Sequence, residues 1–374
     1  MIPFNKPYFT GKEVEYINNA VGLGKLSGNG HYTQLCHKFF EEKYGFKKCL
    51  LTTSCTDALE MAAILSEIKE GDEVIMPSFT FVSTANAFIL RGARIVFADS
   101  RTDEPNIDLE KVEQLITPRT KALVVVHYAG VSCDMEKALE IANRHHIILI
   151  EDAAQGIESF YKRKRLGTFG HISAFSFHET KNIISGEGGL LAINDERFVR
   201  RAEIIWEKGT NRAEFFRNEV NKYGWVDIGS SFLPSELTAA FLFAQIEEMQ
   251  SIQKKRMDIW NYYFEALKPL AKAGHFSLPF IPDYATHNAH MFYILCPDHK
   301  QQDAMLKHLK EKGILAVFHY LPLHESAFFH SLHDGRNLNN TIRYSETIIR
   351  LPLFYELSEN ECQYIVETIR NFFL

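Results

Sequence analysis

The chain is organised around the stretch Ser176-Phe177-His178-Glu179-Thr180-Lys181-Asn182, which continues into Ser185-Gly186-Glu187-Gly188-Gly189. Its single lysine stands between the apolar run 172–177 and a glycine-rich turn. Upstream, Asp152 follows closely on the apolar run 147–150. A lysine amine can form a Schiff base with an aldehyde cofactor, and a nearby carboxylate can keep that cofactor's pyridine nitrogen protonated. A lone lysine is most often a solvated surface charge, so the pairing of Lys181 with Asp152 favours the cofactor interpretation.

The composition is that of an ordinary globular protein. The 374 residues are 46% hydrophobic and 24% charged, and this length suffices for a large domain and a smaller one. The formal net charge is −6. The only basic cluster, 162–165, is predicted to be an exposed turn, so nothing indicates a nucleic-acid partner. An anionic substrate therefore has to be held by a local site.

The six cysteines, at positions 36, 49, 55, 133, 296 and 362, include no Cys-x-x-Cys pair. Their spacing indicates neither a zinc site nor a disulfide framework. The first seven residues contain no secretory apolar core, and no segment approaches the roughly twenty apolar residues that span a bilayer. We therefore expect reduced thiols, no membrane partner and a cytoplasmic location.

Alternating strand-like and helical segments predict the fold class. Short apolar runs separated by helices indicate an α/β fold with a mainly parallel sheet covered on both faces. The expected strands are 49–52, 73–76, 94–98, 122–126, 147–150, 172–175 and 190–193. The expected helices are 12–21, 33–44, 58–65, 84–91, 109–116, 135–145 and 197–206.

The second part of the chain predicts a smaller α+β unit. A sustained helical period over 237–263 is expected to link it to the large sheet. Segments 291–295 and 316–318 are strand-like, whereas 304–312 and the segments from Ile342 and Glu359 are helical. We assign residues 1–245 to an arm and a large domain, and 246–374 to the linking helix and a small domain.

Ligands of such sheets bind beyond the carboxyl ends of the strands. Thr56, Phe81, His127, Asp152 and Ser176 all follow strand-like runs. We therefore expect these five residues to converge on one crevice.

Two short segments have the composition of phosphate sites. The turn 53–57 between a strand and a helix can offer hydroxyls and N–H groups to an anion, although an ordinary helix cap uses the same residue types. The glycine-rich loop 22–30, with Lys25, can cradle a phosphate or be only a flexible turn.

Six short motifs follow one another along the chain. They are Thr53-Ser54-Cys55-Thr56, Pro77-Ser78-Phe79-Thr80-Phe81, Val126-His127-Tyr128-Ala129-Gly130, Glu151-Asp152-Ala153-Ala154-Gln155, the stretch 176–182 and Glu187-Gly188-Gly189. In this order the chain resembles the sugar-nucleotide aminotransferases of the type I (aspartate aminotransferase-like) PLP fold, the DegT/StrS group. The resemblance implies pyridoxal 5'-phosphate as the cofactor. It also implies transfer of an amine from L-glutamate to a 4-keto sugar nucleotide, a dTDP-sugar.

The same resemblance implies roles for individual residues. Lys181 holds the cofactor covalently and moves the proton between the two carbons of the transamination. Asp152 pairs with the protonated pyridine nitrogen. Gln155 approaches the phenolic oxygen of the cofactor, and Phe81 stacks on its ring. Taken alone, Phe81 could be a core residue and Gln155 a helix cap.

The resemblance assigns the cofactor phosphate to Cys55, Thr56 and Ser176. Many relatives add an asparagine from the neighbouring subunit, but the corresponding position in this chain is Leu233. We therefore expect a serine, with Ser231 as the candidate, to take over that contact.

Substrate contacts follow from charge and from the same resemblance. Lys25 and Arg212 are candidates for the sugar nucleotide's diphosphate, because an anion in an acidic protein needs fixed cations. The resemblance implies a homodimer with shared active sites. The polar segment 209–223 is long for a simple connection, so it is the candidate to cross to the partner. The alternative is that it covers its own domain and leaves Arg212 solvated.

A histidine-containing loop completes the expected site. His319 and Tyr320 belong to a segment that looks like the family's sugar-side loop. His319 and His324 have no third ligand at a suitable spacing, so we expect no metal.

Other activities remain open. One is a sugar 3-aminotransferase, and another is a 4-aminotransferase of opposite stereochemistry on a related nucleotide sugar. A PLP-dependent sugar dehydratase is disfavoured, since relatives of that kind carry histidine in place of Lys181. A regulatory protein that keeps the fold without turnover is also possible, but no DNA-binding segment accompanies the chain.

Overall fold

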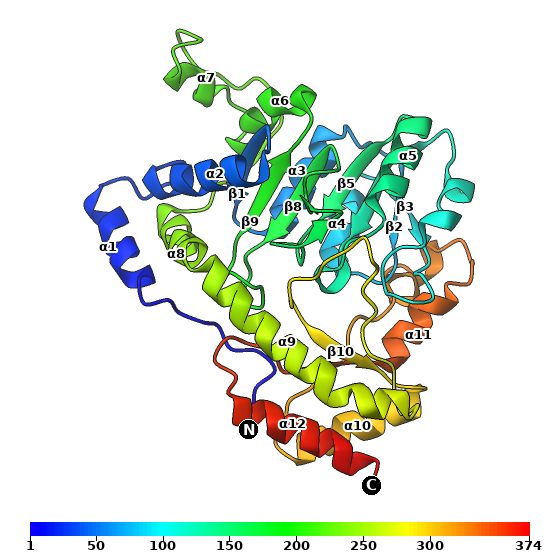
Figure 1. Cartoon of the computed structure of the whole chain (residues 1–374). Helices are drawn as coiled ribbons and strands as arrows, with labels where there is room; N and C mark the ends of the chain where they lie inside the picture. Colours follow the sequence, from blue (N-terminus) through cyan, green and yellow to red (C-terminus); the bar gives the residue numbers. More distant parts are fainter.

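The computed structural model describes all 374 residues (Figure 1). Its centre is a seven-stranded sheet with the strand order β1-β9-β8-β5-β4-β2-β3. The strands are β1 (Lys48–Thr52), β2 (Glu73–Pro77), β3 (Arg94–Ala98), β4 (Thr120–Val126), β5 (Ile148–Asp152), β8 (Ile172–Ser176) and β9 (Gly189–Ile193). Only β9 runs against its neighbours, β1 and β8; the other pairs are parallel. The predicted α/β fold with a mainly parallel sheet is confirmed.

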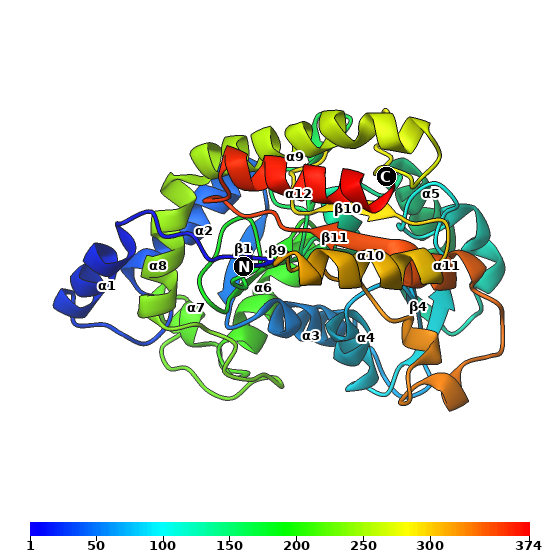
Figure 2. The same ribbon diagram turned by 90° about the horizontal axis from the view of Figure 1, so that it is seen from below.

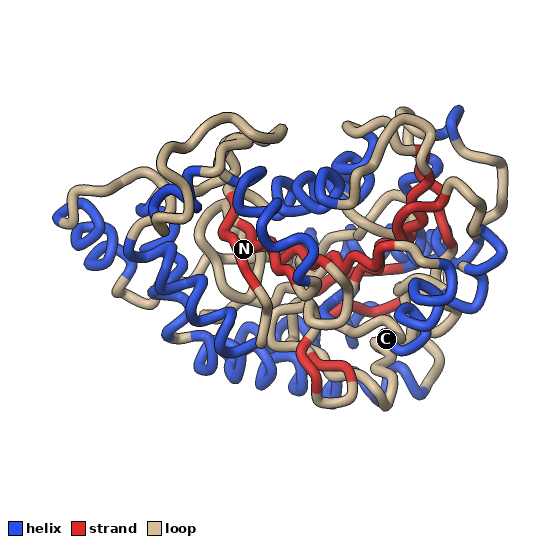
Figure 3. The backbone as a smooth tube through the Cα atoms, turned by 90° about the horizontal axis from the view of Figure 1, so that it is seen from above, coloured by secondary structure: helices blue, strands red, loops and turns tan.

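Helices cover both faces of this sheet (Figure 3). One layer comprises α3 (Cys55–Leu65), α4 (Val82–Ile89) and α6 (Glu196–Trp206), and the other comprises α2 (His31–Tyr44), α5 (Met135–His145) and α8 (Glu236–Glu247). Strand side chains alternate between the layers. In β1, Leu50 packs with α3 and α6, whereas Cys49 and Leu51 pack with α2 and α8.

Most of these helices begin where a short polar side chain caps them. The side chains of Ser54, Asp134, Asp195 and Ser235 each accept a hydrogen bond from a backbone N–H in the first turn of α3, α5, α6 and α8. Such caps satisfy donors that have no partner within the helix. The local sequence therefore determines where these helices start.

The smaller unit lies across the carboxyl edge of the large sheet (Figure 2). It contains α9 (Met249–Lys272), β10 (Phe292–Leu295), α10 (His299–Glu311), α11 (Asn339–Thr347), β11 (Ile348–Leu351) and α12 (Glu359–Phe372). β10 and β11 pair antiparallel. The first turns of α9 bury Met249 and Ile252 in the large unit, and later turns bury Ile259 in the small one. The division after residue 245 stays a prediction.

The remaining elements are short. They are α1 (Glu13–Gly22), the hairpin β6 (Phe160–Tyr161) and β7 (Lys164–Arg165), α7 (Arg212–Phe216), and the 3-10 turns η1 (Leu109–Lys111), η2 (Glu113–Leu115), η3 (Tyr128–Gly130), η4 (Leu323–Glu325) and η5 (His330–Leu332). Figure 1 shows α7 projecting from the body of the molecule beyond α6.

Three predicted elements are wrong in detail. The helix expected over 109–116 is two 3-10 turns, a geometry that places Leu109 and Val112 on one side, where both are buried. The helix expected over 237–263 is broken at Glu248, so that α8 and α9 both bury apolar residues in one core. The strand expected over 316–318 is reduced to a single bridge between Val317 and Arg350.

Three global features bear on partners. None of the helices combines the length and the apolar character needed to traverse a bilayer. All six cysteines are free thiols. No group of three or more histidine, cysteine or carboxylate side chains is placed to hold a metal ion.

Candidate active site

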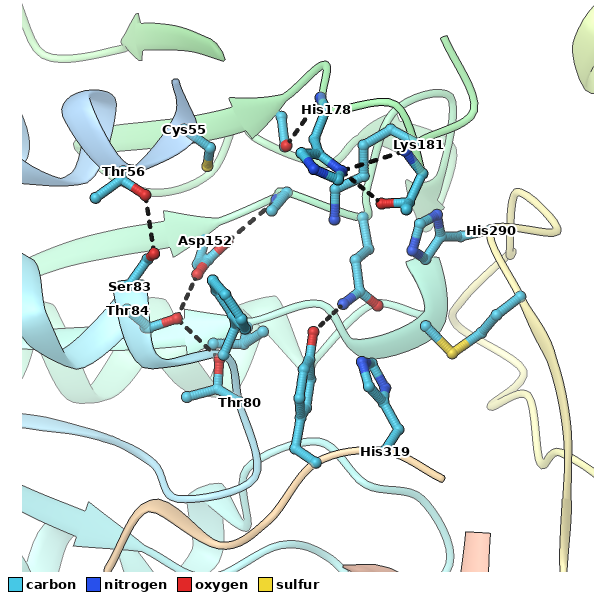
Figure 4. A pocket seen from close by; sticks show the side chains of 18 of the residues that line it. Cys55, Thr56, Thr80, Ser83, Thr84, Asp152, His178, Lys181, His290 and His319 are labelled. Atoms are coloured by element: carbon cyan, nitrogen blue, oxygen red, sulfur yellow. Dashed lines mark hydrogen bonds between the residues drawn. The ribbon is translucent and has the colours of Figure 1, made fainter. Parts of the chain in front are cut away.

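A cavity of about 490 Å³ lies between the two units, at the carboxyl edge of the parallel strands. Its wall combines residues from the ends of β4, β5 and β8, the starts of α3 and α4, and the small unit. Figure 4 shows Asp152, Thr84 and Lys181 around this cavity. The position is the one expected for a ligand site in an open α/β sheet.

Lys181 is held by the turn that follows β8. Its backbone N–H donates to the carbonyl of His178 at 2.9 Å, and the N–H of Glu179 donates to the carbonyl of Gly186 at 2.9 Å. Burial lowers the pKa of the Lys181 amine, although the nearby Cys55 and Asp152 oppose this shift. A lowered pKa enlarges the neutral, nucleophilic fraction of the amine.

Asp152 stands at the end of β5 with both carboxylate oxygens occupied. Oδ2 accepts from the Thr84 hydroxyl at 2.7 Å, and Oδ1 accepts from the N–H of Ala154 at 3.1 Å. The Thr84 hydroxyl is itself 2.8 Å from that of Thr80. Burial raises the pKa of Asp152, while these hydrogen bonds and Lys181 oppose the shift. A cation placed against this buried carboxylate would stabilise its charged form.

The start of α3 has the features that suit an anion. Ser54 caps the helix by accepting from the N–H of Asp57 at 3.1 Å, and this leaves the N–H groups of Cys55 and Thr56 without partners in the helix. A Cβ on Gly189 would come within 2.5 Å of the Cys55 nitrogen, so glycine is required where β9 passes the helix start. Unpaired N–H groups and the helix dipole together suit a phosphate.

Hydroxyls surround that helix start. The Thr56 hydroxyl donates to the Ser83 hydroxyl at 2.8 Å, and both residues line the cavity together with Ser176. These groups give a phosphate further donors beyond the two N–H groups.

Gln155 and two aromatic rings form another wall. Gln155 Oε1 accepts from the N–H of Ala129 at 2.7 Å, and its Nε2 donates to the Tyr320 hydroxyl at 3.2 Å. The rings of Phe81 and Tyr320 lie 6.2 Å apart. Phe81 is 56% exposed. It is therefore not a core residue, and its ring is accessible to a stacking partner.

Two buried histidines line the cavity on the side of the small unit. His319 Nδ1 lies 2.9 Å from the Tyr128 hydroxyl, and His290 Nδ1 lies 3.1 Å from Asn182 Oδ1. Burial holds the pKa of each imidazole well below its usual range. Both rings are therefore neutral, which removes two potential cations from the cavity.

The structure does not bring every predicted residue together. His127 was expected in the crevice, but it is fully buried behind it, with Nε2 3.0 Å from Glu151. That prediction was wrong because the imidazole is held away from the cavity by buried partners, Glu151 at Nε2 and the N–H of Cys133 at Nδ1. Lys25, Arg212 and Ser231 are exposed and lie outside the cavity of this chain. Their predicted roles require a second subunit and stay predictions.

Several cavity residues were missed by the sequence analysis. Thr80 stands in the motif 77–81 and Thr84 in the first turn of α4, but neither was given a role. Arg350 is a lone charge in the apolar run 348–353, a signal that could have been read. His178 stands in the stretch 176–182 but was given no role, and Phe4 carries no comparable signal.

The geometry defines a class of protein. A half-buried lysine, a buried carboxylate and a helix start with N–H groups that lack partners in the helix meet at the carboxyl edge of a seven-stranded sheet. This is the site of a pyridoxal-phosphate enzyme of the type I fold, and the residues present fit that cofactor.

Comparison with known proteins supplies the family. The model of the DegT/DnrJ/EryC1/StrS aminotransferase family matches residues 7–370. The chain is 32% identical to the spore coat polysaccharide biosynthesis protein SpsC of Bacillus subtilis, over 99% of this chain and 96% of that protein. It is 31% identical to the GDP-perosamine synthase of Escherichia coli O157:H7, over 100% and 98%.

A solved structure agrees with these relatives. The Helicobacter pylori aminotransferase PseC, involved in pseudaminic acid biosynthesis, superimposes with a TM-score of 0.90 at 26% identity, covering 100% of this chain and 99% of that one. The chain belongs to the DegT/DnrJ/EryC1/StrS aminotransferase family. It is a PLP-dependent sugar aminotransferase.

Proposed function

We propose that the enzyme transfers the amine of L-glutamate to C4 of dTDP-4-keto-6-deoxy-D-glucose. The products are dTDP-4-amino-4,6-dideoxy-D-galactose and 2-oxoglutarate. The aminated sugar then serves cell-surface polysaccharide synthesis, such as that of enterobacterial common antigen or O-antigen. The polysaccharide role of SpsC supports this last step.

A second set of segments carries the proposal. The chain resembles dTDP-4-amino-4,6-dideoxygalactose transaminase in the segments 1–5, 86–88, 207–212, 227–231 and 288–293. Phe4, Asn5, His290 and Met291 from these segments line the cavity. The resemblance to that enzyme therefore extends to the wall against which donor and sugar must bind.

The residues of the cavity suggest separate roles in cofactor binding and proton transfer. Bound PLP supplies an electron sink that stabilises negative charge on the reacting carbon. The amine of Lys181 would hold the cofactor, and it would accept and return the proton that moves between the two carbons. Asp152 would supply the negative charge for the ring nitrogen, and the hydrogen bond from Thr84 orients that carboxylate. The start of α3 anchors the phosphate.

We also propose a homodimer with shared sites. The partner would supply Arg212 for the diphosphate and Ser231 for the cofactor phosphate. The guanidinium of Arg212 is exposed and rests on the rings of Phe216 and Tyr223, at 5.1 and 6.0 Å. Trp225, in the same projecting region, is 83% exposed. Large exposed apolar side chains of this kind are typical of a surface that another chain covers.

A GDP-linked keto sugar is the second candidate substrate. The 31% identity to GDP-perosamine synthase supports this alternative.

Analysis of the reaction product distinguishes the candidate substrates. The purified enzyme is given nitrogen-15-labelled glutamate with the dTDP-linked 4-keto sugar, its 3-keto isomer, or a GDP-linked 4-keto sugar. Mass spectrometry reports transfer, and proton couplings in the NMR spectrum report the position and configuration of the amine.

The expected product is the dTDP-linked galacto sugar with its amine at C4. Amination at C3, a gluco configuration, or turnover of only the GDP-linked sugar would each contradict the proposal. None of these outcomes would disturb the assignment to the aminotransferase family.

A further inference from the structure

His290 lines the cavity on the side of the small unit, and the roles proposed for the cavity residues leave its imidazole unused. The residue is 8% exposed. Its Nδ1 lies 3.1 Å from Asn182 Oδ1. Its Nε2 makes no hydrogen bond with the protein and is not enclosed by it, so this nitrogen is open to the cavity.

The amide of Asn182 can have only one orientation. Its nitrogen Nδ2 donates to the backbone carbonyl of Asn288 at 2.7 Å and to Gln253 Oε1 at 3.0 Å. The amide nitrogen of Gln253 donates to the same carbonyl, which identifies the oxygen of Gln253 as the acceptor for Asn182. A backbone carbonyl can only accept, so the oxygen of Asn182 is the atom that faces His290.

This orientation determines the tautomer of His290. Asn182 Oδ1 can only accept, and His290 Nδ1 therefore carries a proton. Burial holds the pKa of His290 well below its usual range. The nearby charges of Lys181, Arg256 and Arg350 act in the same direction. Because the ring is neutral, its only N–H is at Nδ1, and Nε2 presents a lone pair to the cavity.

The backbone of His290 is anchored as firmly as its ring. Its N–H donates to Asn288 Oδ1 at 3.0 Å, and its carbonyl accepts from Arg256 Nη2 at 2.7 Å. The side chain of Asn288 in turn donates to the carbonyls of Gln155 and Ile157 at 2.7 and 2.6 Å. The position of Nε2 is thus fixed by contacts from both units of the molecule.

Lys181 is the reactive group near this imidazole. It directly precedes Asn182 in the chain, and its charge contributes more than any other to the low pKa of His290. Figure 4 shows both side chains on the same side of the cavity. The amine of Lys181 makes no hydrogen bond with the protein. A lone pair without a donor and an amine without an acceptor therefore share one region of the cavity.

We propose that His290 Nε2 accepts a hydrogen bond from the Lys181 amine whenever this amine is free, and so positions it for proton transfer. This inference rests on the proposed role of Lys181 in moving the proton between the two carbons. The bond to one N–H leaves the lone pair of the amine free to face the reacting carbons. The bond also stabilises the ammonium that exists while Lys181 carries the proton. A protonated imidazole would repel that ammonium, so the neutral ring is the form that this role needs.

The protons of this step balance without a change at His290. The lone pair of the Lys181 amine takes the proton from one carbon, and the resulting ammonium returns a proton to the other carbon. His290 keeps its own proton on Nδ1 and accepts only from an N–H that is not transferred. His290 is therefore a positioning residue, and Asn182 fixes its tautomer.

Two substitutions of similar size separate the acceptor from the space that it fills. His290→Leu removes the acceptor, whereas His290→Gln can offer an amide oxygen in its place. Absorbance follows the conversion of the cofactor by glutamate alone, and the reverse conversion by the amino sugar nucleotide alone. We expect His290→Leu to lower the maximal rate of both half-reactions roughly 10- to 100-fold, the effect of one hydrogen bond to a charged group. The substrate concentrations for half-maximal rate should change less than about threefold, and His290→Gln should recover most of the rate.

The charge state of Lys181 gives a readout that does not depend on turnover. The full chain is loaded with pyridoxamine phosphate, which has no aldehyde and leaves the Lys181 amine free. The pH dependence of acetylation at Lys181 by acetic anhydride, quantified by peptide mass spectrometry, reports the pKa of this amine. Because an acceptor stabilises the ammonium, His290→Leu should lower this pKa by about one to two pH units, and His290→Gln should restore it.

Nitrogen-15 NMR of labelled histidine tests the tautomer in the same loaded protein. The resonances of His290 are assigned by their loss in His290→Gln. We expect Nδ1 to carry the proton and Nε2 to be unprotonated at neutral pH, and Asn182→Leu should abolish this preference. A proton on Nε2 in the wild type would overturn the proposal.

The matched control is His287→Gln. His287 belongs to the same loop, but its ring packs on Trp260 at 4.0 Å outside the cavity, and burial lowers its pKa to about 4. This variant should keep the wild-type rates and the wild-type pKa of Lys181. An unchanged pKa of Lys181 in His290→Leu would refute the hydrogen bond, and a loss of rate confined to one half-reaction would assign His290 to that substrate instead. If His290→Leu shifts the pKa of Lys181 as expected but the wild-type enzyme is inactive with glutamate, only the proposed donor is refuted.

Discussion

Replacing Asp152 by asparagine should remove charge from the site without disturbing its geometry. The amide oxygen can still accept from the N–H of Ala154, now 3.1 Å from Oδ1. The amide nitrogen then faces Thr84, which can accept from it and donate to Thr80, 2.8 Å away. Because the hydroxyl chain can reverse in this way, we expect the variant to fold and to bind the cofactor.

The expected loss of rate follows from electrostatics. For an assumed separation of roughly 4 Å, a carboxylate would stabilise a protonated ring nitrogen by about 4 kcal/mol at an effective dielectric constant near 20. Asp152 is only 5% exposed, so solvent screens this interaction little. Each 1.4 kcal/mol of barrier is about tenfold in rate, and the variant should therefore be about a thousandfold slower.

The assay is the steady-state rate with glutamate and the keto sugar nucleotide, combined with the cofactor content and the melting temperature. The matched control is Asp134→Asn, because Asp134 accepts from the N–H of Lys137 and from the Tyr161 hydroxyl, outside the cavity. Asparagine also caps helices well, so this control should keep near-normal activity. A rate within tenfold of wild type for Asp152→Asn would refute the assigned role, as would an equal loss in the control.

The remaining predictions concern the lysine, the subunit interface and pH. Borohydride should fix the cofactor to Lys181, and Lys181→Ala should lose turnover by orders of magnitude; a labelled peptide elsewhere in the chain would exclude this role. If each site takes Lys181 from one subunit and Arg212 from the other, mixing inactive Lys181→Ala with inactive Arg212→Ala should restore activity in one of the two sites of a mixed dimer. Persistent inactivity, with mixed dimers shown to form, would remove the shared-site role of Arg212. His37 is 2% exposed, its Nε2 accepts from the N–H of Leu51, and burial lowers its pKa to about 3. Between pH 6.5 and 3 the unfolded chain therefore binds a proton that the folded chain does not, so acidification should lower the free energy of unfolding by up to about 1.4 kcal/mol per pH unit. His37→Asn, followed by urea denaturation at pH 7 and pH 5, should flatten this dependence, and an unchanged slope would contradict it.

The local sequence predicted an element correctly where the structure of that element depends on its own residues. The strands β3 and β8 and the helix α5 begin at predicted residues, because apolar runs and the cap at Asp134 are local signals. The segment 109–116 was harder, since its apolar spacing of three also fits 3-10 turns. The break at Glu248 follows from packing against a shared core, and no local pattern marks it.

The candidate site likewise contains residues that the local sequence revealed and residues that it did not. Lys181 and Asp152 stand out because each ends an apolar run with a reactive group, and the motifs order them along the chain. The contacts of Thr84 and Arg350 are with residues far away in the sequence, and no local pattern reveals them. Thr84 meets Asp152 across 68 positions, and Arg350 meets the ring of Phe4 at the opposite end of the chain.

The sequence alone thus determined the parallel sheet, its helices and the lysine–carboxylate pair, because these depend on periodicity, caps and residue chemistry within short segments. Only the tertiary structure decided which charges face the cavity and which are neutralised. It buried His127 against Glu151 and left Arg350 without a counterion. The reason is that desolvation and pairing depend on the three-dimensional neighbours of a side chain, and here those neighbours come from two units that meet only when the whole chain has folded.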